Sequence, residues 1–300
     1  MSVGTLLNDV AHGMMRPVGR SLRMASPRAY ERVRWRLANV PLVGKLLGHP
    51  MYHNLVLPFV ARRGDVVFDV GANIGQYTLP LARLVGPSGR VHSFEPVSAT
   101  FAELRSAVGK AGLGGRVVLN QLALGHESGT VELTLPVERP TEASLSPHQG
   151  LAWADYETDR YKYVTERVEM LALDEYVKLR NIGPIAFLKC DVEGAELGVL
   201  QGAREVLSGP APPVLQLEVF AEWTRNFGYS PGDLFAYLRD TGGYEIFWFC
   251  ERGLERIGPN ADPIPGIFHE WVDFLCLVPD VHRIRFDARP YLVRGSLARG

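Results

Sequence analysis

Four carboxylates of this chain stand in or directly after short apolar runs. Uninterrupted apolar runs of this length predict strands buried on both faces of a parallel sheet. In open α/β sheets, ligands bind at the carboxyl ends of the strands, so these acids are expected around one ligand crevice. The four are Asp69 in the run 66–70, Glu95 after 91–94, Asp191 after 185–190, and Glu218 at the end of 214–218.

The glycine spacing after the first run indicates which ligand the crevice takes. Gly71 and Gly75 allow a sharp turn and a close approach of the backbone, and the helix expected over 76–84 offers N–H groups at its start. Dinucleotide sites need Gly-x-Gly-x-x-Gly, whose second glycine makes room for a pyrophosphate. Ala72 and Asn73 stand in that place here. A phosphate-free nucleoside ligand therefore fits better, and S-adenosylmethionine is such a ligand.

The acids near this loop suit the two polar parts of that cofactor. Glu95 lies 24 residues beyond Gly71 and can accept hydrogen bonds from both ribose hydroxyls. Pro96 ends the strand and fixes the turn. Asp69 is expected under the glycine loop, where it receives the amino group of the cofactor or fixes the loop through water.

A second group of charged residues follows the fourth predicted strand, and several roles stay open for it. Asp191 or Glu193 could act as a general base for a hydroxyl acceptor. Alternatively, Asp191 and Glu218 could hold a divalent ion such as Mg²⁺. Lys189 either takes part in the site or pairs with one of these acids. Glu196 is expected to be a helix-start charge or a surface residue.

Composition is that of an ordinary globular protein. The 300 residues are 46% hydrophobic and 22% charged, with a net charge of −1, which gives no general case for nucleic-acid binding. The three cysteines, Cys190, Cys250 and Cys276, lie in apolar runs and are expected to be reduced core thiols of a cytoplasmic protein.

The N-terminal part differs from the rest in charge. Residues 1–60 contain eight Lys or Arg and two acids. We expect residues 1–50 to form a basic helical extension that contacts an anionic membrane surface, caps the domain or serves as a homodimer contact. No apolar run is long enough for a transmembrane helix, and no signal-peptide pattern is present.

The remaining pattern predicts a doubly wound α/β domain over 51–280, with a tail over 281–300. Seven strands with intervening helices are expected, and the last two strands, near 244–250 and 272–278, are expected to pair antiparallel at one edge. Residues 137–163 are polar, aromatic and too long for a simple connection, so we expect a lid or substrate loop with His148 as a weaker base candidate. Its aromatic residues suit stacking on a ring of the acceptor: Trp153, Tyr156, Tyr161 and Tyr163.

These residues together resemble the FkbM-type family of S-adenosylmethionine-dependent class I methyltransferases. The resemblance covers about residues 52–280, and its family-specific part is the Asp-Val-Glu-Gly-Ala-Glu block at 191–196. The other matching pieces are the segment 64–75, Phe94-Glu95-Pro96, residues 120–125 and Leu173-Asp174-Glu175-Tyr176.

The resemblance implies O-methylation of a hydroxyl on a sugar or natural-product scaffold. By position, Gly71, Asn73 and Gly75 would line the methionine part of the cofactor, and Glu95 would hold the ribose. Asn120 to Ala123 would border the adenine, and Asp191 would lie near the sulfonium and the acceptor. Two other functions compete with this one: a nicotinamide-dependent oxidoreductase, which the missing glycine disfavours, and a non-catalytic binding module on the same fold.

Overall fold

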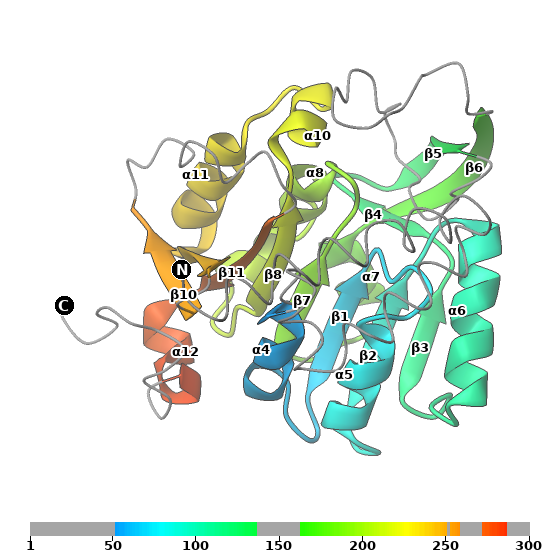
Figure 1. Ribbon diagram of the computed structural model, residues 1–300, viewed down its shortest axis with the longest axis horizontal. Coiled ribbons are helices and arrows are strands. Elements are labelled where there is room, and N and C mark those ends of the chain that lie inside the picture. Colours follow the sequence, from blue (N-terminus) through cyan, green and yellow to red (C-terminus); the bar gives the residue numbers. More distant parts are fainter. Residues whose placement is uncertain (1–51, 137–162, 251–252, 259–271, 287–300) are drawn as a thin grey trace, which may run out of the picture. The chain divides into compact units, whose positions relative to one another are not determined.

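The structure is a computed structural model that describes residues 52–136, 163–250, 253–258 and 272–286 (Figure 1). The chain divides into two compact units, Met1–Val56 and Leu57–Gly300. Most of the first unit lies outside the described residues, so the expected basic extension over 1–50 stays a prediction, as do the domain limits 51–280 and 281–300.

An eight-stranded sheet forms the centre of the second unit, in the order β10-β9-β11-β8-β7-β1-β2-β3. Five neighbouring strands, from β8 to β3, run parallel, whereas β11 is antiparallel to both β8 and β9, and β10 is antiparallel to β9. The α/β class and the antiparallel edge are therefore confirmed. The strands are β1 Val66–Val70, β2 Arg90–Phe94, β3 Val117–Asn120, β7 Phe187–Cys190, β8 Val214–Val219, β9 Glu245–Cys250, β10 Gly253–Ile257 and β11 Val272–Leu277.

A smaller sheet of three strands, in the order β4-β6-β5, is a feature that the seven expected strands do not include. It consists of β4 Ala123–Gly125, β5 Gly129–Pro136 and β6 Tyr163–Ala172. Register places Pro136 opposite Tyr163, the two residues that flank the segment 137–162. Of the expected lid, only Tyr163 is described, as the first residue of β6; His148 and the other lid residues lie outside the described residues.

Helices cover both faces of the central sheet. Helices α7, α8, α9 and α11 share one apolar core with alternate strand residues such as Phe68, Leu188 and Leu217. On the other face, α5 packs against β1 and β2 and is drawn in front of them in Figure 1. The helices are α4 Tyr52–Val60, α5 Thr78–Val85, α6 Ser98–Lys110, α7 Leu173–Leu179, α8 Glu196–Gln201, α9 Arg204–Ser208, α10 Ala221–Asn226, α11 Pro231–Gly242 and α12 Pro279–Phe286.

Two local features of the helices involve close contacts. Residues 196–208 form two helices, α8 and α9, and between them Gly202 packs so tightly that an added Cβ would stand 2.0 Å from the carbonyl oxygen of Gly125. At the start of α6, Val97 is the N-cap, and the Ser98 hydroxyl contacts Glu166 on β6.

Cys190 and Cys276 are buried free thiols, as expected, whereas the side chain of Cys250 is outside the described part. No helix in the described ranges is long and apolar enough to cross a membrane.

Candidate functional site

The glycine loop after β1 satisfies its own amide groups. Every N–H from Gly71 to Gly75 donates to an acceptor within the protein, so the loop presents no row of free amides to a ligand. The acceptors are Phe94 O for Gly71 and Ala72 (3.1 and 2.9 Å), a Glu95 carboxylate oxygen for Asn73 (2.9 Å), the Asn73 side-chain oxygen for Ile74 (2.7 Å), and Ala72 O for Gly75 (2.9 Å).

Gly71 has to be glycine for two reasons. Its φ is +74°, in the left-handed region. A Cβ added to it would stand 1.8 Å from the carbonyl oxygen of Asp191. The backbone of the glycine loop therefore touches the backbone at the end of β7, where the Asp191 N–H also donates to Val70 O at 3.1 Å.

Glu95 holds this loop from the end of β2. One carboxylate oxygen accepts the Asn73 N–H at 2.9 Å and the other accepts the Val97 N–H at 3.0 Å. Burial raises the pKa of Glu95 to about 7, although these N–H groups lower it. Because a carboxylate offers about four lone-pair positions, Glu95 retains capacity for two further donors. β2 ends at Phe94, two residues before Pro96.

Asp69 anchors the start of α5. Its side chain is fully buried and accepts a hydrogen bond from the Thr78 hydroxyl at 2.5 Å, and that hydroxyl also contacts the Ser93 hydroxyl at 2.8 Å. Burial raises the pKa of Asp69, against the lowering effects of Lys189 and Thr78. The Asp69 carboxylate thus fixes the start of α5 through Thr78. Because Asp69 is fully buried, its carboxylate is not accessible for direct contact with an amino group of the cofactor.

Asn120, at the end of β3, is buried and turned into the core. Its side-chain N–H groups donate to Ser93 O and Val118 O, and its oxygen accepts the Tyr176 hydroxyl at 2.9 Å. Ala123 is half-buried at the start of β4. Only the backbone of Asn120 and the residues after it are therefore available to border a ligand.

Asp191 is partly accessible in this crevice. Its side chain is 27% exposed, and its Oδ2 lies 2.6 Å from Nζ of Lys189, whose own side chain is 4% exposed. Burial lowers the pKa of Lys189, but the carboxylates of Asp191 and Asp69 outweigh it and raise that pKa above its usual value. Lys189 therefore keeps its positive charge beside Asp191.

Glu218 completes a carboxylate pair with Asp191. Burial raises the pKa of Glu218 well above its usual range, and the neighbouring Asp191, with which it shares a side-chain hydrogen bond, raises it further. A raised pKa favours the protonated form of Glu218 beside Asp191. Within the described residues, no group of three or more His, Cys, Asp or Glu side chains is arranged to hold a metal ion.

Glu196 stabilises the turn after Asp191. Of the two expected roles, the structure confirms the helix-start charge, since α8 begins at Glu196, and excludes the surface position, since this residue is 1% exposed. One of its oxygens accepts the N–H groups of Val192 and Gly194 at 3.0 and 3.2 Å, and burial raises its pKa to about 7 despite them. Glu193 adopts φ +56°, a left-handed conformation that side chains other than Asn and Asp rarely take.

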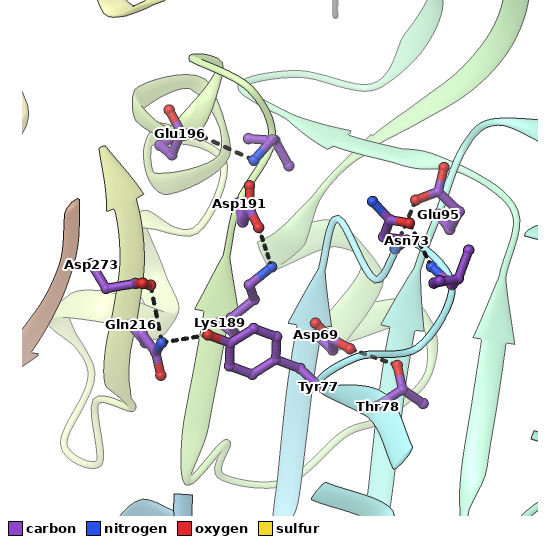
Figure 2. Close-up of polar contacts among 12 residues, drawn as sticks. Asp69, Asn73, Tyr77, Thr78, Glu95, Lys189, Asp191, Glu196, Gln216 and Asp273 are labelled. Carbon is purple, nitrogen blue, oxygen red and sulfur yellow. Dashed lines mark hydrogen bonds and ion pairs between the residues drawn. The ribbon is translucent and has the colours of Figure 1, made fainter. Parts of the chain in front are cut away.

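Two residues that sequence reasoning left out of the site lie between its halves. Tyr77, just before α5, places its ring 4.7 Å from Lys189 Nζ, and its hydroxyl oxygen accepts the Gln216 amide at 2.9 Å. Gln216 also donates to Asp273 at 3.1 Å (Figure 2). The signal for Gln216 was its place inside the apolar run of β8, because a buried amide needs partners.

Figure 2 shows the resulting arrangement: Glu95 and Asn73 lie on one side, Lys189 and Asp191 in the middle, and Gln216 and Asp273 on the other. A family model described as "Methyltransferase FkbM domain" matches residues 69–246, which is more than half of the chain and contains every one of these residues except Asp273. The chain belongs to the FkbM-type family of S-adenosylmethionine-dependent methyltransferases.

Individual relatives agree with membership in the FkbM family. The chain is 33% identical over 162 residues to the 31-O-demethyl-FK506 methyltransferase FkbM of Streptomyces tacrolimicus, which covers 48% of this chain and 61% of the relative. It is 28% identical over 151 residues to Methyltransferase 1 of Beauveria bassiana, covering 45% and 57%. The matches thus span about three fifths of these relatives' lengths.

Among solved structures, a SAM-dependent O-methyltransferase from Thermotoga maritima is similar to the chain with a TM-score of 0.38 and 13% identity, covering 75% of this chain and 63% of that one.

Proposed function

We propose that this FkbM-family protein transfers a methyl group from S-adenosylmethionine to a hydroxyl of a small molecule or glycan. The observation that carries the choice of donor is the glycine loop with all five amides engaged. A pyrophosphate needs free N–H groups, whereas the ammonium and sulfonium of S-adenosylmethionine need acceptors and negative charge. The same observation disfavours a nicotinamide-dependent oxidoreductase.

Glu95 is the proposed ribose ligand. Its two oxygens already hold the loop through Asn73 and Val97 and retain capacity for two further donors. Glu95 directly follows β2, where the second strand of such folds meets the ribose. Gly71, Ala72, Asn73 and Gly75 form the proposed wall around the methionine part, and the backbone from Asn120 to Ala123 the border of the adenine.

Asp191 is the proposed general base. In the transfer, an oxygen lone pair of the acceptor forms the new O–CH₃ bond, while the S–CH₃ bond breaks and its electron pair goes to sulfur. The hydroxyl proton passes to Asp191, and S-adenosylhomocysteine leaves as a neutral thioether. Alignment of the two reactants contributes about 7–11 kcal/mol in well-oriented systems, and the base about 10²- to 10⁴-fold.

One contact supports Asp191 over Glu193 as that base. Lys189 Nζ lies 2.6 Å from Asp191 Oδ2 and holds this carboxylate in one position. A divalent ion held by Asp191 and Glu218 is the competing way to acidify the hydroxyl. Exhaustive chelation separates the two: full activity afterwards supports the base, and a loss restored by Mg²⁺ supports the ion.

The experiment for the function itself starts with calorimetric titration of S-adenosylmethionine and NAD. Hydroxylated sugars and natural-product scaffolds are then screened with a methyl-labelled donor. Binding of S-adenosylmethionine with label in an ether product supports the proposal. Binding of NAD alone would replace it with an oxidoreductase, and binding of S-adenosylmethionine with no transfer to any acceptor would favour a non-catalytic module.

A further inference from the structure

Tyr77 connects the two halves of the crevice. In the chain it follows the glycine loop by two residues, and its buried side chain reaches across the sheet to residues of β7 and β8. Its ring lies under the Lys189 ammonium, and its hydroxyl meets Gln216 (Figure 2). No role for Tyr77 or Gln216 follows from the proposed chemistry alone.

The orientation of the Gln216 amide is fixed by its second partner. Asp273 can only accept when ionised, so the amide nitrogen has to face it, and the same nitrogen meets the Tyr77 oxygen. The Gln216 oxygen is left buried without a hydrogen-bond partner, at a cost of about 1–3 kcal/mol. The orientation of the Gln216 side chain is therefore set by the hydrogen bonds that its N–H groups donate, and one of these bonds holds Tyr77 at its hydroxyl.

Three carboxylates lie near enough to attract the Lys189 ammonium. Asp69 is its register partner on β1, and Glu218 and Asp191 are the other charged groups that act on it. Because a lysine has a flexible four-carbon side chain, a further contact is needed to determine which of the three carboxylates its ammonium binds. The ring of Tyr77 contacts the ammonium by a cation–π interaction, and the ammonium points to Asp191 at 2.6 Å.

We propose that Tyr77 is a positioning residue of methyl transfer: its ring, held by Gln216, directs the Lys189 ammonium onto Asp191. This inference rests on the proposed function, because it takes Asp191 as the base. Lys189 then holds the Asp191 carboxylate in one rotamer through their ion pair. Because Tyr77 directly follows the glycine loop, the same contact ties the donor side of the crevice to the acceptor side.

The test uses the full chain with Tyr77→Leu, which removes ring and hydroxyl, and Tyr77→Phe, which removes only the hydroxyl. Tyr244→Leu and Tyr244→Phe are the matched controls, since Tyr244 is as deeply buried but donates to Pro213 O at 3.0 Å, away from the crevice. The readouts are the ¹³C titration of the Asp191 carboxyl, assigned by its loss in Asp191→Asn, and kcat with the affinity for S-adenosylmethionine.

For Tyr77→Leu we expect the midpoint of the Asp191 carboxyl titration to rise by about one pH unit, because the Lys189 ammonium no longer lies beside this carboxylate. We also expect kcat to fall at least tenfold, as the estimate for a base held in the wrong rotamer, with donor affinity unchanged. Tyr77→Phe keeps the ring and should shift both readouts in the same direction but less. It carries the test if the leucine variant does not fold.

An Asp191 midpoint that stays at the wild-type value in the Tyr77 variants, or that moves equally in the Tyr244 variants, overturns the inference while leaving the proposed function standing. A midpoint that rises as expected, in a protein whose wild type transfers no methyl group, supports the contact and instead refutes the proposed function.

Discussion

The carbonyl oxygen of Asp191 occupies the space where a side chain on Gly71 would begin. An added Cβ would stand 1.8 Å from that oxygen, far inside van der Waals contact. The donor loop after β1 and the charged turn after β7 are thus in direct backbone contact. In the proposed function, this contact sets the distance between the sulfonium and the base.

Replacing Gly71 tests that contact. Gly71→Ala should lower the free energy of unfolding and weaken binding of S-adenosylmethionine, because the loop must move away from Asp191. Gly112→Ala is the control, since Gly112 has a similar φ of +67° with nothing within 4 Å of an added Cβ. It should cost only the left-handed strain of about 1–2 kcal/mol. Urea unfolding and calorimetry of both variants measure the difference, and equal losses would contradict the contact.

The pH dependence of donor binding tests Glu95. Its pKa of about 7 means that it is partly protonated at neutral pH, and a ribose hydroxyl donates better to the ionised form. Affinity for S-adenosylmethionine should therefore fall as the pH drops below about 7, by up to about tenfold per unit. Glu95→Gln, which is neutral at every pH, should bind more weakly at pH 8 but show a flat profile. The same slope in wild type and variant would assign it to another group.

Stability should depend on pH through Glu196. Its pKa is raised from 4.5 to about 7, so the native state binds the proton more tightly than the unfolded chain. The stability gained from this proton is complete below pH 4.5 and is lost as the pH rises through 7, by roughly 3 kcal/mol at most. In Glu196→Gln, thermal unfolding should show no such loss of stability with rising pH, because the amide does not titrate while its oxygen still accepts from Val192 and Gly194. The exposed Glu205→Gln is the control that should retain it.

Much of the fold was predictable because buried parallel strands are visible in the sequence. The runs around Asp69 and Glu95 became β1 and β2 with nearly the expected limits, and the edge strands β9 and β11 are antiparallel as predicted. The three-stranded sheet was not predicted in full. Only two residues of β6 are buried, and the segment 137–162 separates β6 from its partner β5 in the sequence, so neither an apolar run nor proximity indicated the pair.

The site was predictable where a charge ends an apolar run and not where a polar residue is buried by tertiary contact. Asp191 and Glu218 were expected together, and in the structure Asp191 lies close enough to raise the pKa of Glu218. Glu196 was expected as a helix-start charge or a surface residue; it does begin α8, but its burial was not predicted, because a carboxylate in the first turn of a helix satisfies the helix dipole without burial. Tyr77 was missed, since an aromatic residue at a helix start is typical of the core.

Removing the carboxylate of Asp191 separates chemistry from binding. Asp191→Asn should lower kcat by about 10²- to 10⁴-fold, with affinity for S-adenosylmethionine within a few fold of the wild type. Because Lys189 then loses its ion-pair partner, the variant should also unfold at lower urea. Glu193→Gln is the comparison: if it, and not Asp191→Asn, abolishes transfer, the base is Glu193.

The most direct test of the account is calorimetric titration of S-adenosylmethionine into the wild type and Glu95→Ala. One site per chain is expected for the wild type, with affinity at least tenfold weaker in the variant, because each lost hydrogen bond to a charged group is worth about 1.5–3 kcal/mol. Unchanged affinity in Glu95→Ala, or no binding by the folded wild type, would contradict the assignment of the donor to the crevice between β1 and β2.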